Sequence, residues 1–100
     1  MPPAVLSPRA RRDLLEAVSW IARDNKAAAL GLRDSLKEAA LRIGRHPHLG
    51  IERPALASPP IRFLILTGYP YVLVYDADRQ PALILRVLHG ARDLPEIFAR

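Results

Sequence analysis

The sequence contains no cysteine and no apolar run long enough to cross a membrane. With Cys 0 in 100 residues, disulfides, cysteine nucleophiles and thiolate metal sites are excluded. The longest uninterrupted apolar run covers residues 71–75, far short of the ~20 residues that a membrane-spanning helix needs. The segment before Arg9 is too short for the apolar core of a signal peptide. We therefore expect a cytoplasmic protein with no membrane contact.

Acidic residues are in short supply. Lys and Arg together number 15 against 10 Asp and Glu, a formal net charge of +5, and most of the excess lies in the first half of the chain. This balance suits an anionic partner, either a nucleic acid or an acidic protein segment. The alternative is that the charges solvate helix faces, because acids are interspersed and no five consecutive basic residues occur. The length allows one domain, residues 1–100.

Motifs for several kinds of chemistry are also missing. There is no Gly-x-Ser-x-Gly elbow and no Gly-rich phosphate loop. His46 and His48, with His89 as a distant third, are the candidates for a metal site, but no carboxylate is packed into their loop and structural zinc usually has four ligands. We expect neither a metal nor a cofactor.

The first half of the chain predicts a helical hairpin. Residues 5–6 can form a short strand, after which Ser7 can cap a helix that has Pro8 in its first turn. Asn25 offers a second cap, and Gly44 is predicted to end the second helix in a left-handed conformation. Apolar residues recur at helical spacing in both segments: Ala10, Leu14, Ala17, Val18 and Ile21, then Ala29, Leu32, Leu36, Ala39, Ala40 and Ile43.

The second half predicts a small antiparallel β-sheet. Three strand-like runs, residues 61–66, 71–76 and 82–88, are separated by short turns, which favour antiparallel pairing. Residues 94–98 can form a short terminal helix. The element order is therefore β-α-α-β-β-β, an α+β fold with the αα-hairpin packed on one face of the sheet.

Residues 86–93 carry the most informative pattern. Strand alternation places Arg86 and Val87 on opposite faces, and Gly90 lets the backbone turn so that Arg92 and Asp93 lie near the strand's end. Arginines beside His89 could stabilise a phosphorane or grip a carboxylate. Alternatively, an ion pair between Arg92 and Asp93 holds the terminal segment in place.

At these residues the chain resembles the ParE-type toxins of the RelE/ParE superfamily of toxin–antitoxin systems. The resemblance covers nearly the whole chain in the right order, and its C-terminal motif is the specific part. It implies a helical hairpin over an antiparallel sheet. The segments that carry it are residues 6–10 with Asp13 and Leu14, residues 47–50 with Arg53, Tyr69, residues 71–75, and residues 85–93.

The resemblance implies a type II toxin that inhibits bacterial growth, supports plasmid stabilisation and is neutralised by a cognate ParD-like antitoxin. ParE-like members poison DNA gyrase, whereas RelE-like members cleave mRNA on the ribosome. The first reading is favoured because the terminal aromatic, Phe98, has no hydroxyl and the two lysines, Lys26 and Lys37, lie in the hairpin. The alternatives are a ribonuclease using Arg62, Arg86 and His89, or a non-toxic co-repressor that binds the antitoxin.

Two surfaces are expected on this basis. Contact with the target is assigned to Arg86, His89, Arg92, Ile97 and Phe98. Contact with an acidic, amphipathic antitoxin segment is assigned to Arg9, Arg12, Ala17, Trp20, Arg23 and Ala28. The alternative for the second set is that Trp20 and the extra alanines widen the internal core. We expect no sequence-specific DNA binding by this chain alone.

Overall fold

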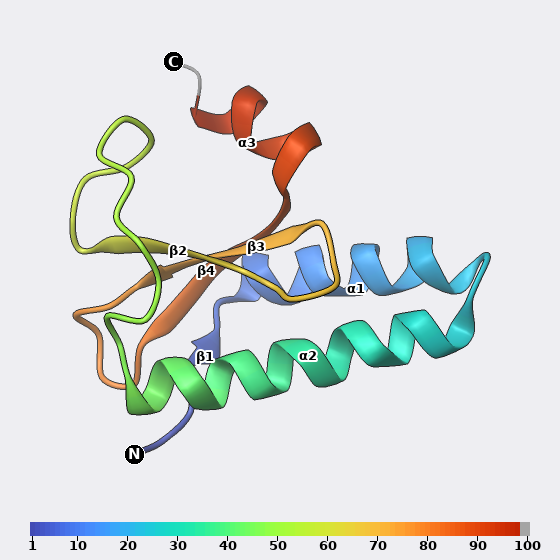
Figure 1. The fold of residues 1–100 in the computed structure, drawn as a ribbon, viewed down its shortest axis with the longest axis horizontal. Coiled ribbons are helices and arrows are strands. Elements are labelled where there is room, and N and C mark those ends of the chain that lie inside the picture. Colours follow the sequence, from blue (N-terminus) through green and yellow to red (C-terminus); the bar gives the residue numbers. More distant parts are fainter. Residues whose placement is uncertain (99–100) are drawn as a thin grey trace.

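In the computed structural model, the backbone is described for residues 1–98 and the side chains for residues 1–94. The order of elements along the chain is the predicted one, and α3 begins four residues earlier than expected (Figure 1). The elements are β1 (Val5–Leu6), α1 (Pro8–Ala22), α2 (Lys26–Arg45), β2 (Ile61–Ile65), β3 (Tyr71–Asp76), β4 (Leu83–His89) and α3 (Gly90–Phe98).

The two predicted caps begin the two long helices. Ser7 Oγ accepts a hydrogen bond from the backbone N–H of Ala10 at 3.0 Å, and Pro8 occupies the first turn of α1. Asn25 Oδ1 accepts from the N–H of Ala28 at 3.0 Å and begins α2. Each cap satisfies an N–H that has no partner within its helix, so each fixes where its helix starts.

The prediction that Gly44 ends α2 is wrong. The helix continues to Arg45, and among the described residues the glycine with a positive φ is Gly68. Gly44 is buried instead because the N-terminal segment crosses the helix there: a side chain at this position would collide with the carbonyl oxygen of Pro2. The Ala4 N–H donates to the Ala40 carbonyl at 2.9 Å, which holds the crossing in place.

The sheet has the strand order β1-β4-β3-β2. The predicted antiparallel pairing is found between β2 and β3 and between β3 and β4. The short first strand differs, because β1 lies parallel to β4, with Val5 opposite Leu83 and Leu6 opposite Ile84. The sheet is therefore mixed, and its first and last strands in sequence are neighbours in space.

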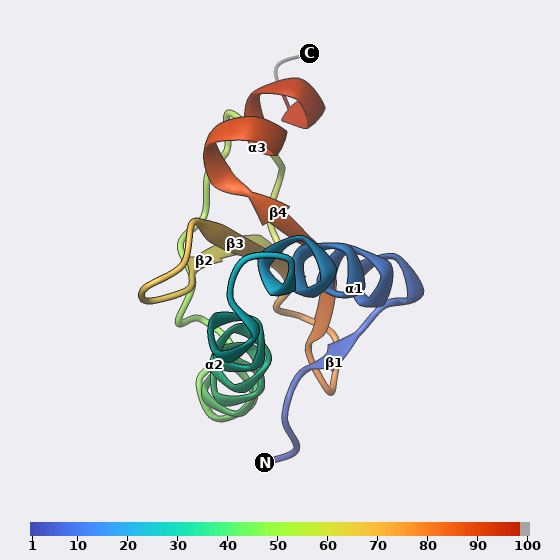
Figure 2. The same cartoon turned by 90° about the vertical axis from the view of Figure 1, so that its right-hand side faces the viewer.

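Apolar side chains pack on both faces of the sheet. The larger cluster lies between the helical hairpin and the sheet, and Figure 2 shows α1 and α2 on that side. A smaller cluster of Phe63, Val72, Val74 and Leu88 lies on the other face, where Leu56, Ala57 and Leu94 pack against it. Both faces of β3 are thus covered, which explains its unbroken apolar run. No helix in residues 1–98 is long and apolar enough to span a bilayer.

Candidate functional site at the α1–β4–α3 corner

Beyond the end of β1, the outer edge of β4 has no strand partner among the described residues, and a carboxylate from α1 accepts hydrogen bonds there instead. Asp13 Oδ2 accepts hydrogen bonds from the Val87 backbone N–H at 3.0 Å and from Arg86 Nε at 2.8 Å, while Oδ1 accepts from Arg86 Nη2 at 3.3 Å. Arg9 adds an ion pair at 3.7 Å. A carboxylate as buried as Asp13, at 9% exposure, needs such partners because burial removes its hydration. The arrangement ties α1 to the sheet.

Arg86 is committed to this contact within the chain. A β-bulge at Leu85 shifts the register so that Ile84 lies opposite Tyr75 while Arg86 lies opposite Val74. The side chain of Arg86 then reaches Asp13, and this hydrogen bond raises the pKa of the guanidinium above its ordinary value. Arg86, predicted as a target-binding residue, therefore has a structural partner.

The corner between β4 and α3 is built from reciprocal caps. The backbone N–H of His89 donates to Asp93 Oδ2 at 2.8 Å, and the N–H of Arg92 donates to His89 Nδ1 at 3.2 Å. Arg92 Nε also pairs with Asp93 Oδ1 at 3.0 Å. The hydrogen bond from Arg92, followed by the one from the His89 N–H, lowers the pKa of Asp93. The structure thus contains the ion pair that the sequence offered as the alternative role for Arg92 and Asp93.

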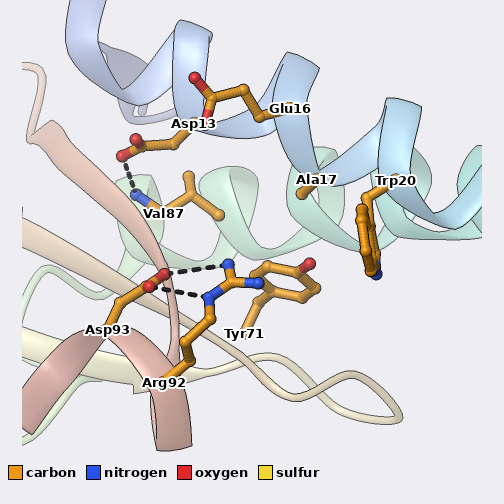
Figure 3. A pocket seen from close by; sticks show the side chains of 8 residues that line it. All are labelled: Asp13, Glu16, Ala17, Trp20, Tyr71, Val87, Arg92 and Asp93. Carbon is orange, nitrogen blue, oxygen red and sulfur yellow. Dashed lines mark hydrogen bonds and ion pairs between the residues drawn. The ribbon is translucent and has the colours of Figure 1, made fainter.

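A hollow of about 290 Å³ separates this corner from α1. As Figure 3 shows, Trp20 extends toward it from α1, Tyr71 from β3 and Arg92 from the start of α3, and Glu16 and Asp93 are among its lining residues. Trp20, the sole tryptophan of the sequence, is 61% exposed, which is high for a large aromatic side chain. The hollow therefore brings together Trp20, Tyr71 and Arg92, which are residue types enriched at protein-binding surfaces.

The predicted antitoxin-binding residues divide into exposed and buried ones. Arg9, Arg12, Arg23 and Trp20 are exposed, and Ala28 is half-buried. Ala17 is buried between the hairpin and the sheet, so its assignment to an accessible surface is wrong. The alternative that Trp20 widens the core is also wrong, because its ring lies outside, with the Arg23 guanidinium 5.1 Å from the ring centroid.

The three candidate ribonuclease residues are not gathered in one place. Arg62 lies opposite Tyr75, near one end of β3, whereas His89 lies opposite Tyr71 at the other end. Four residues of strand correspond to roughly 13 Å. Arg62 Nη1 donates to the Gly50 carbonyl at 2.9 Å and so holds the loop after α2. Arg62, Arg86 and His89 each have a partner within the chain.

The remaining predicted residues lie elsewhere. The backbone of Ile97 and Phe98 belongs to α3, but their side chains lie outside the described part of the chain. His46 and His48 are in the loop that follows α2, and His89 contacts Tyr71 edge-to-face with ring centroids 5.5 Å apart.

Sequence reasoning missed two residues that organise this fold. Asp13 was not among the positions predicted to face the core, although it follows Ala10 by three residues and precedes Ala17 by four, the spacing of the buried face. Tyr75 was treated as an ordinary strand residue. Its hydroxyl donates to the Pro47 carbonyl at 2.7 Å and accepts from the Gly50 N–H at 2.8 Å, and burial raises its pKa.

Comparison with known proteins agrees with this architecture. A search of curated proteins finds no match. Among solved structures, the chain is similar to one described as "Chromosomal ParDE TA system from P. aeruginosa", with a TM-score of 0.72 and 20% sequence identity over 89% of this chain and 96% of that one. The family model described as "ParE toxin of type II toxin-antitoxin system, parDE" matches residues 4–94. The chain therefore belongs to the ParE toxin family of type II toxin–antitoxin systems.

Proposed function

We propose that this toxin inhibits bacterial growth by binding DNA gyrase in the cytoplasm, without catalysing a reaction itself, and that a ParD-like antitoxin neutralises it. Membership of the ParE family supports a gyrase target. The observation that carries the choice of binding over RNA cleavage is the separation of Arg62 and His89 at opposite ends of β3. Proton transfer in a ribonuclease requires its acid, base and cationic groups within hydrogen-bond reach of one phosphate.

The proposed target surface is the β4–α3 corner. Arg92 offers a side chain that is 60% exposed, beside the capping residue His89. Figure 1 shows α3 projecting from the sheet, away from the helical hairpin, so a large partner can approach it. Within this proposal Arg92, His89 and the end of α3 at Ile97 and Phe98 contact gyrase, while Arg86 holds the corner in place through Asp13.

Two assays on purified protein test the target. We expect inhibition of gyrase supercoiling and no cleavage of mRNA on translating ribosomes. Arg92→Ala is expected to weaken gyrase inhibition by a factor of about 30, the range for an arginine hot spot. Arg33→Ala, an exposed arginine on α2, is the matched control and should leave inhibition unchanged. Ribosomal mRNA cleavage would overturn the proposal in favour of a ribonuclease, and inactivity in both assays would favour a non-toxic co-repressor.

The proposed antitoxin surface is the outer face of α1. Exposed Arg9, Arg12 and Arg23 flank the exposed ring of Trp20, a combination suited to an acidic, amphipathic segment. Arg12→Glu with Arg23→Glu is expected to slow association with the antitoxin and weaken it at least about fivefold. Arg45→Glu, at the far end of α2, should leave the affinity unchanged. Equal affinities for all variants would exclude this surface.

A further inference from the structure

The hollow between α1 and the start of α3 contains a tyrosine whose hydroxyl reaches the solvent there and has no hydrogen-bond partner among the described residues. Tyr71 is 4% exposed and lines the hollow, and Figure 3 shows its phenol directed toward the space below α1. The described residues give this hydroxyl no hydrogen bond, whereas Tyr69 and Tyr75 each donate one to a backbone carbonyl. This hydroxyl can therefore donate a hydrogen bond to, or accept one from, a group that enters the hollow.

The charges around the hollow leave one carboxylate unpaired. Asp13 is neutralised by Arg86, and Asp93 by Arg92, each through two hydrogen bonds. Glu16 is exposed at the rim of the same space, and no described residue forms an ion pair with it. The side chains that line the hollow are thus net negative in a protein with a formal charge of +5, so the hollow favours a cation.

The aromatic residues determine which cation fits. Trp20 follows Glu16 by one helical turn, so an indole face and a carboxylate lie side by side on α1. A planar guanidinium stacks on an indole and forks onto a carboxylate, whereas an ammonium does neither as well. A volume of about 290 Å³ is at the lower limit for a small-molecule pocket and suits a single side chain.

We propose that this hollow is the binding site for an arginine side chain of a protein partner, held by Glu16, the Tyr71 hydroxyl and the Trp20 ring. Arg92 keeps its pair with Asp93 at the rim. Trp20 also belongs to the surface proposed above for the antitoxin, so the antitoxin is the partner that brings this arginine, and that assignment rests on the proposed function. The site's preference for a guanidinium does not depend on it.

Binding is measured with a probe that needs no partner protein. N-acetyl-arginine methylamide is titrated into the toxin while the indole N–H resonance of Trp20, the one tryptophan of the sequence, is followed by NMR. We expect a saturable shift with a dissociation constant on the order of 1 mM, typical of a ligand of this size. The isosteric citrulline compound, which lacks the charge, should bind at least about fivefold more weakly.

Two conservative variants locate the site. Glu16→Gln and Tyr71→Phe are each expected to weaken arginine binding at least about threefold, and Glu38→Gln, an exposed glutamate on α2, should have no effect. Should Tyr71→Phe fail to fold, the exposed Glu16→Gln variant carries the test. Equal binding of the citrulline and arginine compounds, no saturable shift, or full affinity in Glu16→Gln would each overturn the proposal. None of these results depends on gyrase inhibition, so the two proposals can fail separately.

Discussion

Two carboxylates on α1, one turn apart, have opposite environments. Asp13 is buried and accepts hydrogen bonds from Arg86 and from the Val87 backbone. Glu16 lies at the mouth of the hollow and has no ion-pair partner among the described residues. The charge of Asp13 is neutralised by contacts that hold α1 against β4. The charge of Glu16 has no such partner in the described part of the chain and is available to a binding partner. We infer that the contacts of Asp13 stabilise the fold, whereas the surface around Glu16 binds a partner.

Substitution of Asp13 is expected to have the largest effect on stability. Asp13→Ala leaves Arg86 and the Val87 N–H without their acceptor, and we expect a loss of about 3 kcal/mol of unfolding free energy. For a domain of this size that is roughly 15 °C in Tm, measurable by thermal denaturation followed by circular dichroism. Asp34→Ala, an exposed aspartate on α2, should stay within about 0.5 kcal/mol of the parent. Similar values for both variants would remove the structural role of Asp13.

Tyr75 extends the comparison to a neutral buried group. Tyr75→Phe removes the hydroxyl that bonds to both the Pro47 carbonyl and the Gly50 N–H. We expect the unfolding free energy, measured by urea denaturation, to fall by about 1–3 kcal/mol. Burial raises the pKa of Tyr75 above 10.0, so its folded form keeps the proton longer than the unfolded chain. Its contribution should therefore be complete below pH 10 and decline above it. A variant as stable as the parent would exclude this anchoring role.

Alanine substitutions of Arg92 and Arg86 test whether an exposed arginine acts in recognition and a partly buried one in stability. The Arg92–Asp93 pair is exposed, so Arg92→Ala should lower stability by about 1 kcal/mol or less while abolishing growth inhibition in cells induced without antitoxin. Arg86→Ala should lower stability more, because it removes the closer of the two guanidinium groups that pair with the buried carboxylate of Asp13. Parallel losses of stability and toxicity in Arg92→Ala would assign Arg92 to structure instead.

Acid unfolding sharpens the role of Asp93. Its hydrogen bonds with Arg92 and the His89 N–H lower its pKa below the ordinary 3.8. The unfolded chain therefore binds this proton first as the pH falls, so the contribution is complete above that value and is lost as the pH falls through the folded pKa. The difference in stability between the parent and Asp93→Asn should be constant above about pH 5 and shrink below pH 4. A difference independent of pH would contradict this assignment.

The smallest expected change in stability is on the recognition side. Trp20 is 61% exposed, so Trp20→Ala should change the unfolding free energy by about 0.5 kcal/mol or less. Antitoxin affinity should nevertheless fall at least about 30-fold, as expected for a tryptophan anchor. Calorimetric titration with the antitoxin measures it, and Leu41→Ala, an exposed apolar residue on α2, is the control. Unchanged affinity would place the interface elsewhere.

Interactions between residues close together in the sequence could be predicted, whereas contacts between residues far apart in the sequence could not. Ser7 and Asn25 revealed the two helix starts because a cap depends on residues three positions away. Gly44 was misread because its small size serves a crossing by the distant N-terminal segment. The site followed the same division. Arg92 and Asp93 are sequence neighbours and were linked correctly. Trp20 and Tyr71 instead meet at one hollow because α1 packs against β4 and β4 pairs with β3, which no periodicity encodes.

The parallel pairing of β1 with β4 has a consequence for how this toxin acquires its shape. The Ser7 hydroxyl reaches the carbonyl of Leu85 across a separation of 78 residues, and Asp13 reaches Val87 across 74. Closing a loop of that length opposes folding by on the order of 4 kcal/mol, and contacts between distant residues slow folding. On a growing chain the two helices can form from local contacts, but the edge strand and the Asp13 anchor must wait until β4 has been synthesised. The fold of this toxin can therefore close only after β4 has left the ribosome, however early its two helices form.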